Sequence, residues 1–174
     1  LQRAALVFAN RDALVYGTAR LTYAQYYRRV TQLAAALVKA GVQPGDVVAT
    51  ILPNIPAQSE AAFGVPACGA VLNTINIRLD VDTIAYILDH GEAKVMLVDS
   101  QFLPQAMAAI GQMQGPAPLV IEVPDDQAGV HAIGTQQNYE DFLTTGDPDF
   151  AWILPLDEWE SLALNYTSGT TGRP

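Results

Sequence analysis

Apolar and polar positions change their period along this chain, and each change predicts an element of secondary structure. Two strand-like runs, 13–16 and 20–23, flank a glycine-containing turn, which is typical of a β-hairpin. Thr22 then opens a helix, because its hydroxyl can accept a backbone N–H bond and Gln25, three residues later, completes a capping box. Gly41 is expected to end this helix in the left-handed conformation. Four apolar positions at helical spacing predict one buried stripe, namely Tyr26, Val30, Leu33 and Leu37.

The remainder of the chain is expected to alternate between strands and helices. Apolar runs rich in β-branched residues predict buried strands at 47–52, 70–73, 94–98, 119–123 and 161–166. Helices are expected between them, at 56–68, from Asp80 or Asp82 to about Gly91, at 101–113, and from Asn138 through Leu143. This alternation is the pattern of βαβ units, so the predicted fold class is α/β, with a parallel sheet and helices on its faces.

Single residues modify this picture of the elements. Gly64 and Pro66 should break or kink the helix at 56–68. Asp99 and Ser100, which follow a predicted strand, can cap the helix after them. The only cysteine, Cys68, has apolar neighbours, so it is expected to pack in a core, and no intrachain disulfide can form.

Composition narrows the classes of function. The chain has 174 residues, of which 50% are apolar and 16% charged, and its formal net charge is -9. This size and apolar content fit one domain, or a piece of a larger one, with a real core. The acidic balance disfavours nucleic acid or an anionic membrane as the main partner. Most of the acidic excess lies in residues 88–174, which is typical of a solvated face.

Neither a metal site nor a membrane span is expected from the sequence. His90 and His131 are the only histidines, and neither has a cysteine or a second histidine nearby in the sequence. The longest apolar run, 61–72, contains Pro66 and is shorter than the roughly 18–20 residues that a transmembrane helix needs. Because no signal peptide is recognisable either, we expect a cytoplasmic protein.

The strongest chemical signal is a run of hydroxyl and glycine residues after the last predicted strand, at 167–172. Phosphate oxygens need many short-range donors, and backbone N–H groups in a turn together with neutral hydroxyls supply them. Gly169 and Gly172 allow close approach and unusual backbone angles. The spacing matches neither G-x-x-x-x-G-K-[ST] nor G-x-G-x-x-G. On composition alone, a plain Ser/Thr/Gly turn therefore remains the alternative.

The complete string at 166–174, YTSGTTGRP, resembles the phosphate-binding signature of the adenylate-forming superfamily. That superfamily includes acyl-CoA synthetases, the adenylation domains of peptide synthetases and firefly luciferase. Five upstream segments resemble the same enzymes, at 21–23, 45–48, 53–54, 69–73 and 76–79. The SGTTG form of the loop and the stretch at 71–79 resemble acyl-CoA synthetases that act on short- or medium-chain fatty acids. The resemblance covers nearly the whole chain.

The resemblance implies a two-step ligase reaction. A carboxylate attacks the α-phosphorus of Mg-ATP to give acyl-adenylate and pyrophosphate, and the thiol of coenzyme A then displaces AMP. The implied substrates are thus a carboxylic acid, ATP and coenzyme A, with Mg²⁺ as cofactor, and a homodimer is one expected assembly. Six residues are implied to hold the β- and γ-phosphates: Thr167, Ser168, Gly169, Thr170, Thr171 and Gly172.

The resemblance also assigns residues 1–174 to an incomplete N-terminal portion of the large, AMP-binding domain. The lysine expected after Pro174, the later adenine, ribose, acyl and Mg²⁺ motifs, and the small C-terminal domain are not in this sequence. The main catalytic residues are therefore expected beyond Pro174, and the 174 residues alone are predicted to be inactive. Three alternatives stay open: an adenylation domain that loads a carrier protein, a non-catalytic nucleotide-binding module, and a luciferase-like oxygenase.

Overall fold

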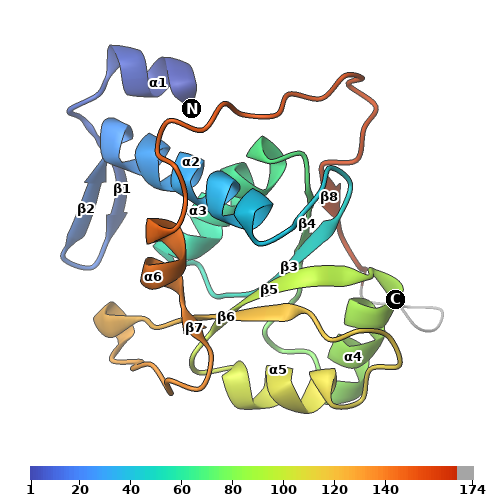
Figure 1. Cartoon of the computed structure of the whole chain (residues 1–174). Coiled ribbons are helices and arrows are strands. Elements are labelled where there is room, and N and C mark those ends of the chain that lie inside the picture. The colour runs from blue at the N-terminus through green and yellow to red at the C-terminus, as the bar shows by residue number, and fades with distance from the viewer. Residues whose placement is uncertain (168–174) are drawn as a thin grey trace.

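A parallel sheet with helices on both faces forms the centre of the fold (Figure 1). The computed structural model describes residues 1–167. Its helices are α1 (Gln2–Val7), α2 (Tyr23–Lys39), α3 (Pro56–Ala67), α4 (Val81–His90), α5 (Leu103–Ile110) and α6 (Tyr139–Thr144), with a 3-10 turn at Asp126–Ala128. Its strands are β1 (Asp12–Tyr16), β2 (Ala19–Thr22), β3 (Val47–Ile51), β4 (Val71–Thr74), β5 (Ala93–Asp99), β6 (Leu119–Val123), β7 (Gln137–Asn138) and β8 (Ala163–Leu164).

The main sheet has the strand order β7-β6-β5-β3-β4-β8, and all neighbouring strands run parallel. The chain starts the sheet at β3 and adds β4 on one side and β5 on the other, as in doubly wound folds. The predicted α/β class with a parallel sheet is confirmed. Because the strands are parallel, their carboxyl ends gather at one edge of the sheet, where ligands bind in such folds.

Each face of the sheet carries its own core layer. Helices α2, α3 and α6 cover one face, and α4 and α5 cover the other (Figure 1). In β3, Val48 contributes to the first layer and its neighbour Ala49 to the second, because successive side chains point to opposite faces. Both are fully buried, which explains why this strand has a nearly continuous apolar sequence.

The start of the chain matches its prediction closely. Strands β1 and β2 form the expected antiparallel hairpin. The capping box is present, since Thr22 Oγ1 accepts a bond of 3.3 Å from the Gln25 backbone N–H and the Thr22 N–H donates to Gln25 Oε1 at 2.9 Å. Gly41 has a φ of 95° after α2, and Cys68 is buried in the core. All four residues of the predicted stripe are also buried, namely Tyr26, Val30, Leu33 and Leu37.

Gly64 and Pro66 were expected to break or kink the helix at 56–68, and the expectation of a break is wrong. Helix α3 runs through Gly64 and ends at Ala67, with Pro66 in its last turn. A Cβ atom at Gly64 would lie 2.8 Å from Leu33 Cδ2, so the glycine gives α2 room to pack against α3. Pro66 is tolerated because it removes one hydrogen bond close to the helix end rather than in its middle.

Two further boundaries differ from the sequence predictions, and helix α1 was not predicted. The helix expected at 101–113 is shorter and has Phe102 as its N-cap; Asp99 instead accepts a bond of 2.8 Å from the Gln101 N–H in the preceding turn. The strand expected at 161–166 pairs only over Ala163–Leu164. Helix α1 has no buried residue and left no hydrophobic period to detect.

A long segment, 145–162, returns the chain from α6 to the far side of the sheet (Figure 1). Trp152 fixes its course over α2, because its ring stacks on Tyr27 with 5.3 Å between centroids and its Nε1 donates to Thr31 Oγ1 at 3.0 Å. The Ile153 N–H donates to the Ala67 carbonyl at 2.8 Å, at the end of α3. These contacts direct the chain toward β4, beside which β8 then forms the edge strand of the sheet.

Replacing Gly64 with alanine should destabilise the fold by about 1–3 kcal/mol, because the new methyl group overpacks the contact with Leu33. Gly111→Ala is the matched control, since its φ is -64° and its Cβ would meet nothing closer than 3.4 Å. We expect that control to be neutral or slightly stabilising. Urea unfolding measures both, and equal midpoints for the two variants would contradict this account.

Candidate functional site

The predicted phosphate-binding run begins at the carboxyl end of β8, at the edge of the sheet. Leu72 pairs with Ala163 and Asn73 with Leu164, so β8 ends beside the end of β4. Thr74 Oγ1 then donates to Asn165 Oδ1 at 3.3 Å. Thr167 is exposed at the end of the described chain. The other five predicted residues lie outside the described residues: Ser168, Gly169, Thr170, Thr171 and Gly172.

The side chain that precedes this run is held by aromatic contacts with α4. Tyr166 is half-buried, and its hydroxyl lies 2.7 Å from His90 Nδ1; the imidazole tautomer decides which atom donates. Its ring meets those of His90 and Tyr86 edge-on, with centroids 5.8 and 6.5 Å away. Burial, and to a lesser extent Tyr86, raises the pKa of Tyr166. Tyr166 is thus neutral at neutral pH, and the hydrogen bond and the two ring contacts hold its side chain against α4.

A second polar region lies where β6 ends, near the β1–β2 hairpin. The Tyr16 hydroxyl donates to Asp125 Oδ2 at 2.6 Å, while Asp125 Oδ1 accepts from the Gln127 N–H at 3.1 Å. The hydrogen bond to Asp125, then burial and the negative charges of Asp125 and Asp99, raise the pKa of Tyr16 to about 12. A cavity of about 150 Å³ adjoins this pair, between the hairpin, α3 and α6.

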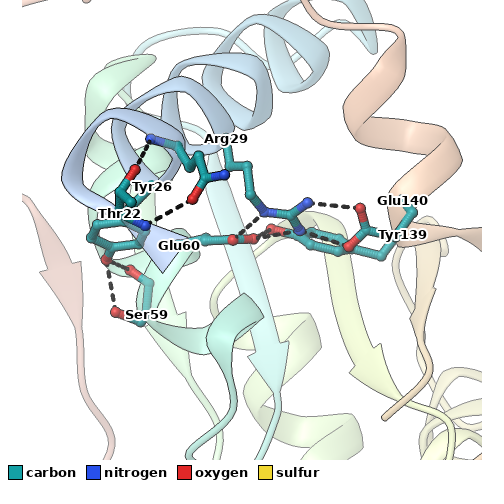
Figure 2. Close-up of polar contacts among 8 residues, drawn as sticks. Thr22, Tyr26, Arg29, Ser59, Glu60, Tyr139 and Glu140 are labelled. Carbon is teal, nitrogen blue, oxygen red and sulfur yellow. Dashed lines mark hydrogen bonds and ion pairs between the residues drawn. The ribbon is translucent and has the colours of Figure 1, made fainter. Parts of the chain in front are cut away.

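One wall of that cavity is a charged network that joins three helices (Figure 2). Arg29 of α2 bonds through Nε and Nη2 to the fully buried carboxylate of Glu60 in α3. The same guanidinium donates to Glu140 of α6 at 2.6 and 2.8 Å, and the Tyr139 hydroxyl donates to Glu60 Oε2 at 2.8 Å. The buried charge of Glu60 thus has a cation and a neutral donor, which its burial requires.

The electrostatics of the network agree with its geometry. Burial lowers the pKa of Arg29, but the hydrogen bonds and charges of Glu140 and Glu60 outweigh it, so the pKa of Arg29 is raised. Burial, followed by the charge of Glu60, raises the pKa of Tyr139 well above its ordinary value. Because every group already has partners, this network supports structure and offers no free group for chemistry.

Sequence reasoning missed the aromatic contacts of His90 and the buried ion pair of Glu60. It considered His90 only as a metal ligand, although Tyr86 four residues earlier places two rings on one face of α4. It also passed over Glu60, the only charged residue in the helix Pro56–Ala67, which was the available signal for a buried ion pair. Within residues 1–167, no group of three His, Cys, Asp or Glu side chains could hold a metal ion, and no helix is long and apolar enough to cross a membrane.

Similarity to known proteins extends over the whole of this chain. The family model described as AMP-binding enzyme matches residues 1–174. The peroxisomal acetate/butyrate–CoA ligase of Arabidopsis thaliana is 43% identical over the whole chain, which covers 32% of that protein. The 2-methylpropanoate–CoA ligase of Humulus lupulus is 38% identical, and the peroxisomal trans-cinnamate:CoA ligase of Petunia hybrida is 40% identical. The chain thus spans about a third of the length of these relatives.

Solved structures have the same fold. An anthranilate CoA ligase in complex with anthranoyl-AMP superposes with a TM-score of 0.86, over 99% of this chain and 32% of that one, at 24% identity. The inhibitor-bound N-terminal domain of FACL13 from Mycobacterium tuberculosis gives a TM-score of 0.80 at 26% identity, over 99% of this chain and 41% of that one. At 24% identity, the similarity to the anthranilate CoA ligase shows a shared fold and no more.

Arg29→Met should destabilise the fold by about 3–5 kcal/mol, because it leaves the charge of Glu60 buried with only the Tyr139 hydroxyl beside it. Glu140→Gln is the matched control, since the Glu140 side chain is 60% exposed and its ion pair should contribute about 1 kcal/mol or less. Urea unfolding compares the two. A loss for Glu140→Gln as large as that for Arg29→Met would refute the buried-charge explanation.

The contribution of Tyr16 to stability should fall as the pH rises from 10 toward 12. In that window the unfolded chain releases the Tyr16 proton at its ordinary pKa of 10.0, whereas the folded chain retains it. The stability advantage of the wild type over Tyr16→Phe should therefore shrink above pH 10, as urea midpoints at pH 8, 10 and 11 would measure. Asp126→Asn, which removes an exposed charge nearby, is the control. The difference in urea midpoint between this variant and the wild type should not shrink above pH 10.

Proposed function

The chain belongs to the AMP-binding enzyme family, and we propose that it forms the N-terminal part of the large domain of an AMP-forming acid–CoA ligase. The observation that carries this proposal is the family match over residues 1–174, which includes the complete YTSGTTGRP string. The position of Tyr166 and Thr167 supports it, because they leave the sheet at the carboxyl edge where nucleotides bind in such folds.

In this proposal the chain's own task is to hold the ATP phosphates. The hydroxyl of Thr167 and the donors of Ser168–Gly172 bind the β- and γ-phosphate oxygens and orient the pyrophosphate leaving group. Preorganised neutral donors stabilise charge that develops on the leaving group without adding the cost of moving a charged side chain. Mg²⁺ bound with ATP would supply positive charge that offsets the repulsion between a carboxylate and the phosphates, and the described residues contain no group of three side chains that could hold it.

The proposed acid is a small monocarboxylate, because the relatives named for acetate/butyrate and 2-methylpropanoate match this chain over its whole length. A relative named for trans-cinnamate matches equally well, so an aromatic acid is the competing substrate class. Coenzyme A is proposed as the acceptor since these relatives are named CoA ligases; a carrier protein is the alternative. A cytoplasmic location and a homodimer stay predictions, and two of these relatives are named peroxisomal.

The test is ATP–pyrophosphate exchange by the full-length protein that carries this chain, with acetate, butyrate, 2-methylpropanoate and trans-cinnamate in turn. Butyrate-dependent exchange, followed by thioester formation with coenzyme A, is the expected result. Exchange without transfer to coenzyme A would favour the carrier-protein alternative, and ATP binding without exchange would favour the non-catalytic module. Residues 1–174 alone should give no exchange, and turnover by them would contradict that expectation.

Thr167→Val should lower kcat/KM for ATP by about 10- to 100-fold, because it removes one donor aimed at the leaving phosphates while keeping the side-chain shape. Thr144→Val is the matched control, since Thr144 is an exposed residue at the end of α6 whose hydroxyl donates to Asp141 within that helix. Steady-state exchange rates at varied ATP measure both variants. Equal kcat/KM values for ATP in Thr167→Val and the wild type would show that the Thr167 hydroxyl does not bind the phosphates.

A further inference from the structure

We propose that His90 is a positioning residue for ATP binding: by holding Tyr166, it fixes the point at which the chain enters the run Thr167–Gly172. The proposal rests on the proposed function, because it takes that run to be the phosphate-binding loop. It assigns His90 no contact with substrate. His90 affects ATP binding only through Tyr166, the residue that precedes the loop.

Few other contacts hold the chain between the end of β8 and the loop. Strand β8 has two residues, and its register with β4 covers only Leu72–Ala163 and Asn73–Leu164. Beyond it, Asn165 and Thr167 are exposed, and the 3.3 Å bond from Thr74 to Asn165 lies at the surface. Among the described residues after Leu164, Tyr166 alone has a shielded side chain. Its contacts therefore decide how firmly this end of the chain is fixed.

Those contacts come from two successive turns of α4. His90 Nδ1 lies 2.7 Å from the Tyr166 hydroxyl, and the Tyr86 ring stacks on the imidazole with 5.4 Å between centroids and 23° between planes. The Tyr166 ring then stands edge-on to both, at 79°. The stack holds the imidazole in one orientation, so its nitrogen points at the hydroxyl. The hydrogen bond itself lies at the surface, so it holds Tyr166 together with the two ring contacts rather than alone.

The end of α4 also packs directly on β8. A Cβ atom at Gly91 would lie 3.3 Å from Leu164 Cδ2 and 3.0 Å from the Ile87 carbonyl, so the helix end and the strand approach each other closely at this glycine. Helix α4 in turn contributes Ile84, Ile87 and Leu88 to the core, all of them at most 1% exposed. His90 therefore stands on a rigid support, which a residue that positions another must have.

Loss of the hydrogen bond should weaken ATP binding more than chemistry. Without it Tyr166 explores more conformations, and ATP must select the one in which the loop starts correctly. The fraction of competent protein falls, so the KM for ATP rises. The KM values for the acid and for coenzyme A, which this loop does not contact in the proposed reaction, should change less than twofold.

The experiment uses His90→Ala and His90→Asn in the full-length protein, with His131→Ala as the matched control because that histidine is exposed and far along the chain from α4. His90→Ala should lower kcat/KM for ATP by about 3- to 10-fold, the loss expected for one hydrogen bond, mainly through KM. His90→Asn should recover most of it, since its amide reaches the place of Nδ1. His90→Ala should have little further effect in a Tyr166→Phe background.

Amide hydrogen exchange gives a second readout that does not depend on turnover. Peptides that contain residues 163–167 should exchange faster in His90→Ala than in the wild type and His131→Ala. Unchanged exchange there, or equal losses in kcat/KM for ATP, acid and coenzyme A, would overturn the proposal. If the wild-type protein fails to catalyse ATP–pyrophosphate exchange, the proposed function fails, while the hydrogen exchange of 163–167 still decides whether His90 holds Tyr166.

Discussion

Parallel pairing of the strands is the constraint on which the rest of this structure depends. A parallel strand cannot return through a tight turn, so each pair needs a connection that crosses a face of the sheet. Helices α3 and α4 are such connections, and they bury the sheet on opposite sides. The same direction rule collects the strand ends at one edge. The scaffold and the place of the candidate site therefore have one physical cause.

The buried carboxylate of Glu60 ties distant parts of the chain to that scaffold. Its ion pair with Arg29 joins α2 to α3, and the second arm of Arg29 reaches Glu140 in α6, 111 residues later in the sequence. Helix α6 starts the return segment that ends at β8, so the network fixes the origin of the segment that carries the candidate loop.

Sequence reasoning succeeded where one local rule decided the outcome and failed where distant residues decided it. The Thr22 capping box and the alternating strands and helices were predictable because propensity, period and capping agreed. The continuous α3 was not, since Gly64 is set by its contact with Leu33, 31 positions away. Likewise, the composition of 167–172 indicated phosphate chemistry, but nothing local links His90 to Tyr166 across 76 positions.

The relatives bear differently on the proposed acid and on the proposed phosphate-binding loop. Relatives named for an acetate or butyrate, a branched and an aromatic acid resemble this stretch to nearly the same degree. Phosphate binding is the step that all such ligases share, and the described edge of the sheet leads into the loop proposed for it. The proposal of a small monocarboxylate therefore rests on what the relatives are named for, whereas the proposal of phosphate binding rests on this chain's own loop sequence and on the sheet edge that leads into it.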